Sequence, residues 1–199
     1  GSPRRGIGFL MSTAATGRVA AIIPAAGSGV RLGADIPKAF LELGGLSLLT
    51  RSALAMSTVA DVLIIAAPVD GLDEASAQVA QVDAEIHIVA GGEHRQESVA
   101  NALRMVPEDV SIVLVHDAAR PLVPIAVTQN VVDAVRNGAK AVIPVLSLVD
   151  TIKRVNNNGI AIETVDRNQL RRVQTPQGFD RATLDLAYQN PEVVATDDA

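Results

Sequence analysis

The chain lacks cysteine and tryptophan, and aromatic residues make up only 2% of its 199 residues. Without cysteine there is no disulfide, thiolate zinc site or cysteine nucleophile. A reducing, cytoplasmic setting is the easiest to reconcile with this composition. The scarcity of aromatic side chains leaves few platforms on which nucleic-acid bases could stack.

Long apolar runs and an excess of basic charge are also missing. No run approaches the ~20 residues that a helix needs to cross a bilayer, so no membrane span is expected. The 17 basic and 22 acidic residues give a net charge of −5, which argues against a general nucleic-acid-binding surface. Any phosphate binding must therefore be local and use a few placed cations.

The length and the 48% hydrophobic content suffice for one domain with a sizeable core. Residues 1–17 are expected to be a disordered tail or a vector-derived remnant, with Met11 a candidate natural start. Residues 18–199 are expected to form a single domain.

Strand-like and helix-like segments alternate along most of this domain. Strands are expected at residues 19–23, 62–67, 86–89, 112–115 and 141–145, and helices at 47–57, 73–81, 96–105 and 125–136. This α/β order predicts a doubly wound, mostly parallel twisted sheet with helices on both faces.

The alternation stops at about residues 150–170. Two strand-like stretches, residues 151–155 and 160–165, flank Asn158-Gly159, and Asn-Gly is a strong hairpin signal. Because two strands alone are marginal in water, the hairpin is expected either to lie on the body or to reach another subunit. The second arrangement would make the protein a dimer.

The most informative motif, residues 25–33 (AAGSGVRLG), follows the first strand, where open α/β sheets bind ligands. Its glycines let backbone N–H groups approach an anion, and Arg31 and Lys38 add two cations. Leu32 stands where a dinucleotide fingerprint needs glycine, and no Gly-Lys-Ser/Thr follows as in a Walker A loop. The motif predicts another kind of phosphate loop, the alternative being a glycine turn with surface cations.

Polar groups follow the third strand as well. The backbone of Gly91-Gly92 can read the edge of a base, while Arg95 and Ser98 open a helix whose amino end favours anions. An ordinary loop is the alternative reading of this segment.

The fourth strand ends at His116-Asp117. Asp117 is placed where a Mg²⁺ ligand facing a phosphate is wanted. Arg120 has a structural alternative, in which it pairs with Asp117 or bonds to loop carbonyls. His116 is expected to be packed or hydrogen-bonded, and His87 is expected to be structural.

A last group surrounds the hairpin: Thr151, Lys153, Arg167 and residues 174–177. Hydroxyls with an arginine at the base of a projecting ribbon could hold a second phosphate. A solvated hairpin face is the alternative.

Taken together, these motifs resemble those of the 2-C-methyl-D-erythritol 4-phosphate cytidylyltransferases of the non-mevalonate isoprenoid pathway. The matching segments run in family order: residues 25–33, 37–38, 91–98, 115–121, 150–153, 164–167, 174–177 and 196–199. The family continues beyond the position of Ala199, through an Asn-Ile-Lys segment whose lysine faces the substrate phosphate.

The resemblance implies a Rossmann-like nucleotidyltransferase with a projecting β-hairpin arm. It implies a Mg²⁺-dependent transferase that joins CMP from CTP to methylerythritol phosphate with release of pyrophosphate, and a homodimer whose arms complete each other's pockets. Arg31 and Lys38 would be the catalytic cations. The CTP site would contain Ala25, Ala26, Gly27, Gly29, Gly92, Arg95, Ser98, Asp117 and Ala118, and the methylerythritol phosphate would be held by Thr151, Arg167, Thr175 and Thr196.

Such a reaction needs no general base, because a phosphate monoester with a second pKa of about 6 is itself the nucleophile. Three other functions stay open. A cytidylyltransferase for another polyol phosphate, such as ribitol 5-phosphate, would share the nucleotide half. A silent nucleotide-binding module would bind CTP without releasing pyrophosphate, and a hydride-transfer enzyme is disfavoured by Leu32.

Overall fold

The computed structural model describes residues 17–27 and 36–189. Their centre is a six-stranded sheet with the order β5-β4-β1-β6-β12-β7. Its strands are β1 (Arg18–Pro24), β4 (Val62–Ala67), β5 (Glu85–Ala90), β6 (Val110–Val115), β7 (Ala141–Val142) and β12 (Gln177–Asp180). β5, β4, β1 and β6 pair in parallel, whereas β12 runs antiparallel to both β6 and β7. The expectation of a mostly parallel sheet is confirmed.

The central strands are buried on both faces, which is why they read as continuous apolar runs. Along β1, Val19, Ala21 and Ile23 pack into one core cluster, while Ala20 and Ile22 pack into the other. All five side chains are fully buried. The register pairs Ile22 with Ile64 on one side and with Val115 on the other.

Helices cover both faces, as the alternation predicts. The helices α1 (Leu48–Ser57), α2 (Leu72–Val79) and α4 (Ile125–Arg136) pack on one face, and α3 (Arg95–Leu103) and α5 (Arg181–Gln189) on the other. Short elements complete the body: η2 (Lys38–Phe40), β2 (Glu42–Leu43), β3 (Leu46–Ser47) and η3 (Val69–Gly71). Among the described residues no helix is long and apolar enough to span a bilayer.

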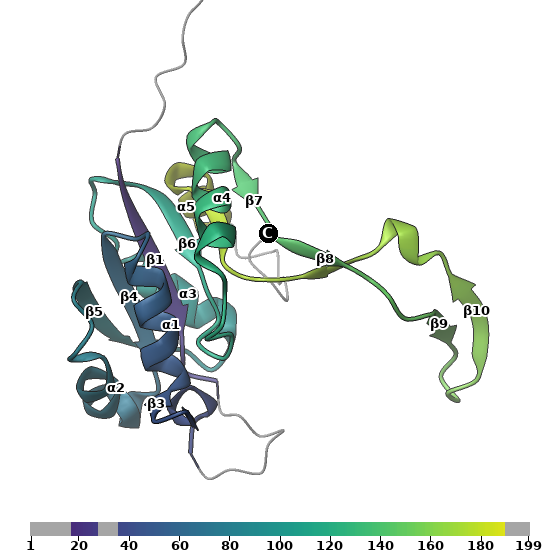
Figure 1. The fold of residues 1–199 in the computed structure, drawn as a ribbon, viewed down its shortest axis with the longest axis horizontal. Helices are drawn as coiled ribbons and strands as arrows, with labels where there is room; N and C mark the ends of the chain where they lie inside the picture. The colour runs from purple at the N-terminus through teal and green to yellow at the C-terminus, as the bar shows by residue number, and fades with distance from the viewer. Residues whose placement is uncertain (1–16, 28–35, 190–199) are drawn as a thin grey trace, which may run out of the picture.

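The expected hairpin is present as an arm that projects from the body (Figure 1). Its stem pairs β8 (Val145–Ser147) with β11 (Arg171–Val173), and its tip pairs β9 (Ile152–Val155) with β10 (Ala161–Val165). The short helix η4 (Arg167–Gln169) lies between β10 and β11.

The prediction of one strand over residues 141–145 is wrong. β7 ends at Val142, and the chain then leaves the sheet to enter β8 in the arm. Pro144 lies at this break, where it has no N–H to offer a ladder, and its carbonyl accepts a hydrogen bond from Gln174 N at 2.9 Å. The place beside β6 is taken instead by β12, which the sequence analysis missed, as it missed α5.

Candidate active site

A pocket of about 640 Å³ opens at the edge of the sheet where the parallel strands β1, β5 and β6 end. This is the edge at which open α/β sheets bind ligands. The loops after these strands supply most of its lining, together with η2 and the start of α3. The lining residues are Pro24, Ala25, Ala26, Gly27, Lys38, Ala39, Gly92, Glu93, His94, Arg95, Ser98, Asp117, Ala118, Ala119 and Arg120.

The loops after β1 and β5 touch each other. Both are bonded to the end of β4, which lies between them: Gly91 N donates to the Ala67 carbonyl at 2.8 Å and Ala25 N donates to the Ala66 carbonyl at 2.7 Å. A Cβ at Gly91 would lie 2.4 Å from the Cβ of Ala26 and 2.9 Å from Ser98 Oγ. Residue 91 therefore has no room for a side chain, because its backbone lies directly against the β1 loop.

Side chains of α3 fix the backbone of the β5 loop. Ser98 Oγ, in a residue only 2% exposed, accepts from Gly92 N at 3.0 Å and donates to the His94 carbonyl at 3.2 Å. Glu97 Oε2 accepts from Glu93 N at 2.8 Å. A Cβ at Gly92 would lie 2.2 Å from the Cβ of Glu97. The loop is thus organised by the protein's own hydrogen bonds, which is the condition for strong electrostatic recognition.

Asp117 lies between two arginines. Its Oδ1 accepts from Nε and from one terminal nitrogen of Arg95, both at 3.0 Å, and its Oδ2 accepts from Arg120 Nε at 3.2 Å. Arg120 also donates to Gln174 Oε1 at 2.8 Å. The alternative in which Arg120 pairs with Asp117 is confirmed. Charge-assisted contacts of this kind hold both guanidinium groups in place at the pocket wall.

These partners do not suit Asp117 to the magnesium role expected from the sequence. Mg²⁺ requires oxygen ligands in near-octahedral geometry, and both oxygens of Asp117 are engaged by guanidinium groups that would repel the ion. The described part of the chain also contains no group of three or more His, Cys, Asp or Glu side chains that could hold a metal. Asp117 fits the orientation of two arginines, and no step is assigned to a metal held by it.

His116 lies beneath this wall, fully buried, as the sequence analysis expects. Its Nδ1 is 2.9 Å from Thr175 Oγ1 and its Nε2 is 3.2 Å from the Arg120 carbonyl oxygen. Burial lowers the pKa of His116 to about 4, so the ring is neutral at pH 7. Asp117 N donates to the same threonine hydroxyl at 3.4 Å.

Helix α1 supports the pocket floor through a buried hydrogen bond. Ser52, fully buried, donates its hydroxyl proton to the Ala118 carbonyl at 2.9 Å. Because Ala118 is only 3% exposed, water has little access to replace this bond. The loop after β6 is therefore anchored to the helix that follows η2.

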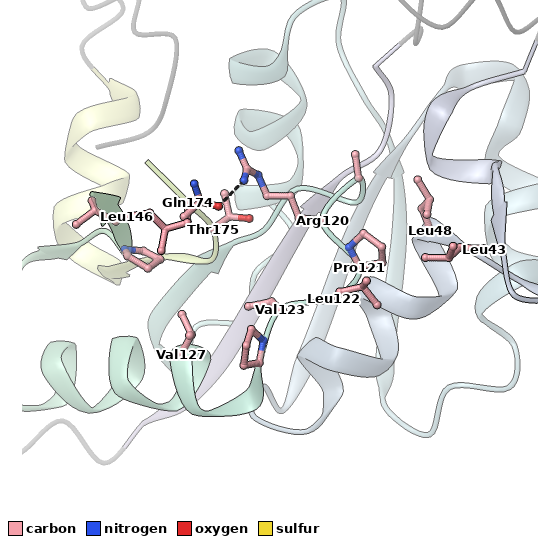
Figure 2. A pocket seen from close by; sticks show the side chains of 14 residues that line it. Leu43, Leu48, Arg120, Pro121, Leu122, Val123, Val127, Leu146, Gln174 and Thr175 are labelled. Carbon is pink, nitrogen blue, oxygen red and sulfur yellow. Dashed lines mark hydrogen bonds between the residues drawn. The ribbon is translucent and has the colours of Figure 1, made fainter. Parts of the chain in front are cut away.

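A second pocket, of about 630 Å³, adjoins the first across Ala119 and Arg120, which line both. Its lining is mainly apolar, and Figure 2 shows Arg120 hydrogen-bonded to Gln174 beside Thr175, with Leu43 and Leu48 at the far end. The other lining residues are Pro121, Leu122, Val123, Pro124, Val127, Pro144, Val145 and Leu146.

The structure gathers most of the residues singled out from the sequence at the first pocket: Ala25, Ala26, Gly27, Lys38, Gly92, Arg95, Ser98, Asp117 and Ala118. Thr175 lines the adjoining pocket. Gly29, Arg31 and Thr196 lie outside the described residues.

Thr151 and Arg167 lie apart from the pockets, at the arm. Both are exposed, and Arg167 donates a hydrogen bond to the Val149 carbonyl. Neither residue lines either of the two pockets described above. Within one chain, the structure therefore does not bring these two candidates together with the nucleotide-side residues.

Two supporting residues were missed by the sequence analysis. Glu97 carries a usable signal, because it stands three residues after the N-cap His94 and a glutamate there reaches back to the loop N–H groups. Ser52 carries no such signal in the sequence, since it lies inside a helix and its partner Ala118 is 66 residues away.

Comparison with known proteins gives one consistent result. A family model described as 2-C-methyl-D-erythritol 4-phosphate cytidylyltransferase matches residues 19–199. A protein of that name from Frankia casuarinae is 48% identical over 187 residues, which cover 93% of this chain and 69% of the relative.

Two solved structures agree in fold. The 4-diphosphocytidyl-2C-methyl-D-erythritol synthase from Anaerococcus prevotii superposes with a TM-score of 0.77 at 28% identity, covering 92% of this chain and 81% of its own. The 2-C-methyl-D-erythritol 4-phosphate cytidylyltransferase from Thermus thermophilus superposes with a TM-score of 0.72 at 33% identity, covering 91% and 81%.

Proposed function

The chain belongs to the 2-C-methyl-D-erythritol 4-phosphate cytidylyltransferase family, and we propose that it transfers CMP from CTP to 2-C-methyl-D-erythritol 4-phosphate. The products are 4-diphosphocytidyl-2-C-methyl-D-erythritol and pyrophosphate. One observation carries the proposal: the loops after β1, β5 and β6 bring a glycine-rich backbone, Lys38 and Arg95 to one pocket.

The nucleotide binds in this pocket. No Phe, Tyr or Trp is among the described residues that line it. The N–H groups of Gly91 and Gly92 are bonded to the Ala67 carbonyl and to Ser98 Oγ, so we assign recognition of the base to backbone carbonyl groups of the Gly91-Gly92 loop. The narrow fit of Gly91 against Ala26 supports this assignment, because a side chain there would separate the two loops that hold the base and the phosphates. Gly27 lines the pocket, and we assign Gly27 and Gly29 to binding of the triphosphate, with Lys38 and Arg31 neutralising its charge.

The reaction is an in-line displacement at the α-phosphorus of CTP. An oxygen of the methylerythritol phosphate forms the new bond to that phosphorus, while the bond to the β-phosphate oxygen breaks and pyrophosphate leaves with the electron pair. The attacking monoester carries most of its second negative charge at neutral pH, with a pKa of about 6. The protein therefore needs to hold the negatively charged monoester close to the negatively charged triphosphate. Arg31 and Lys38 stabilise the charge on the α-phosphoryl oxygens.

Because Asp117 is engaged by Arg95 and Arg120, Mg²⁺ would be bound by CTP itself, and it would supply further neutralisation of the phosphate charge.

The arm supplies the rest of the substrate pocket, in trans. Thr151 and Arg167 lie at the arm, outside their own chain's pocket, and the projecting arm exposes apolar side chains such as Ile160 (61% exposed) and Ile162 (59%). A homodimer would cover this surface and would deliver Thr151 and Arg167 to the partner's pocket. Thr175 and Thr196 complete the methylerythritol phosphate site. The absence of cysteine supports a cytoplasmic location.

A pyrophosphate-release assay tests the activity. The enzyme with CTP, Mg²⁺ and methylerythritol phosphate should release pyrophosphate, whereas replacing CTP with UTP, or the acceptor with ribitol 5-phosphate, should lower the rate strongly. Equal rates with both acceptors would contradict the substrate assignment, and tight CTP binding with no release would contradict the activity.

Complementation tests the arm exchange. Lys38→Ala and Arg167→Ala each disable both pockets of their own dimers, but a mixed dimer keeps one intact pocket. Random mixing of co-expressed subunits should therefore restore about a quarter of the wild-type activity. No recovery in a mixture shown to contain mixed dimers would contradict exchange of the arms.

A further inference from the structure

The hydrogen bonds of His116 fix which of its ring nitrogens carries the proton. Nε2 lies 3.2 Å from the carbonyl oxygen of Arg120, and a carbonyl can only accept. Nε2 must therefore be the protonated nitrogen. Both partners of the ring, this carbonyl and the Thr175 hydroxyl, are uncharged and the ring is fully buried, which is the setting of a neutral imidazole.

The other ring nitrogen then determines the direction of the next bond. In a neutral ring protonated at Nε2, Nδ1 is an acceptor. The contact of 2.9 Å between Nδ1 and Thr175 Oγ1 consequently requires the threonine hydroxyl to be the donor. A hydroxyl has one proton and two lone pairs, so Thr175 has no proton left for any other partner. One lone pair is approached by Asp117 N at 3.4 Å.

We infer that His116 is a positioning residue that holds Thr175 as a pure hydrogen-bond acceptor, so that Thr175 recognises a hydroxyl group of the polyol substrate and not its phosphate. This deepens the proposed function and rests on it. A phosphate oxygen near Thr175 Oγ1 would face a lone pair, whereas a substrate hydroxyl can donate a proton to that lone pair.

The surroundings of Thr175 agree with a polyol subsite. Thr175 lines the pocket that adjoins the nucleotide pocket across Arg120 (Figure 2). Gln174, the residue before it, accepts from Arg120 at 2.8 Å, which holds that guanidinium beside Thr175. Apolar side chains such as Leu146 and Val123 form the rest of this pocket, and they suit the carbon skeleton of a small branched polyol.

His116 also connects this subsite to the nucleotide side. Through Arg120 and Thr175 it joins the loop after β6 to the segment that precedes β12. Asp117, the next residue, orients Arg95 and Arg120. Because the ring bonds directly to Thr175 and reaches Arg95 only through the neighbouring Asp117, a change in its hydrogen bonding should alter polyol recognition more than nucleotide recognition.

Nitrogen NMR of the free protein tests the assignment without any substrate. The spectrum of ¹⁵N-histidine-labelled protein should show His116 as the neutral tautomer with a protonated Nε2 and a bare Nδ1, and His116→Gln identifies the signals. A protonated Nδ1 would overturn the inference, because Thr175 would then accept from the ring and keep its own proton for a phosphate.

Kinetics with substrate analogues test the consequence. Thr175→Val should raise KM for methylerythritol phosphate by about 10-fold, the loss of one hydrogen bond to a buried group, while KM for CTP stays unchanged. Analogues that each lack one hydroxyl should identify the group that Thr175 binds. One of them should have a raised KM with the wild-type enzyme, and its KM should not rise further with Thr175→Val. If Thr175→Val raised KM by the same factor for every analogue, the inference would be overturned.

Matched variants separate positioning from simple stability. Thr175→Ser should restore KM, since it keeps the hydroxyl. His116→Asn retains an acceptor near the Nδ1 position and should keep KM close to wild type, whereas His116→Gln retains only the donor to the Arg120 carbonyl and should raise it. Equal KM values for the two His116 variants, with equal thermal stability, would overturn the positioning role. A wild-type enzyme that turns over no polyol phosphate would sink the proposed function, while the nitrogen spectrum alone still decides the His116 assignment.

Discussion

Replacing Gly91 by alanine should separate the two loops that hold CTP. The added Cβ would lie 2.4 Å from the Cβ of Ala26, and ordinary contact begins at 3.4 Å. One loop must therefore move by about 1 Å, since Ala26 has no flexible side chain that could turn away. Displacements of about 1 Å in a catalytic pocket can cost about 10²-fold in rate, so kcat/KM for CTP should fall by that order.

The overlap also strains the fold, so a control with an overlap of the same distance, away from the pocket, is needed. Gly178 provides it, because a Cβ there would lie 2.4 Å from Val131 Cγ1, in the packing of β12 against α4. Overpacking of this kind costs about 1–3 kcal/mol, and both variants should lose stability in a urea titration. Only Gly91→Ala should lose affinity for CTP in equilibrium binding and in steady-state kinetics.

The pair of variants has a clear refuting result. A folded Gly91→Ala protein with wild-type KM and kcat for CTP would show that the contact between the loops does not shape the nucleotide site. An equal loss of CTP affinity in Gly178→Ala would show that the effect follows general destabilisation.

Three further predictions concern single side chains. Lys38→Ala should lower kcat by roughly 10²-fold, as does loss of one preorganised donor to a transition-state oxyanion, and near-normal turnover would remove Lys38 from the mechanism. Ser52→Ala should cost about 1–3 kcal/mol in urea unfolding, because the buried Ala118 carbonyl loses its donor, whereas Ser57→Ala, at an exposed hydroxyl, should cost much less. Burial lowers the pKa of His116 from 6.5 to about 4. Between pH 6.5 and pH 4, His116 is therefore protonated in the unfolded chain and neutral in the folded chain. The free energy of unfolding should thus fall as pH drops from 6.5 to 4, by about 3 kcal/mol in total, and His116→Asn should remove this slope.

The parallel core was predictable because its strands are short β-branched runs buried on both faces. The strand over residues 62–67 and the helix over residues 125–136 match the observed bounds. β12 was not predictable in the same way, since Gln177–Asp180 has no apolar alternation and is buried by its neighbours β6 and β7. Its place in the sheet is decided by tertiary packing.

The nucleotide side of the site followed from motifs, because each glycine or cation comes directly after a strand and strand ends meet at one edge of a sheet. The role of Asp117 did not follow. A carboxylate at a strand end suits a metal, but two arginines from different segments, Arg95 and Arg120, engage it in the folded chain. The pairing with Arg120 is local, three residues away, and was one of the alternatives weighed from the sequence. The pairing with Arg95 crosses 22 residues and leaves no local signal.

The fate of each phosphorus atom of CTP tests the central claim most directly. With methylerythritol phosphate and Mg²⁺ present, a label in the α-phosphate should appear in the cytidylyl-alcohol product, and a label in the γ-phosphate should appear only in pyrophosphate. Transfer of the γ-label to the alcohol, or release of the α-label as free CMP, would contradict nucleotidyl transfer by this pocket.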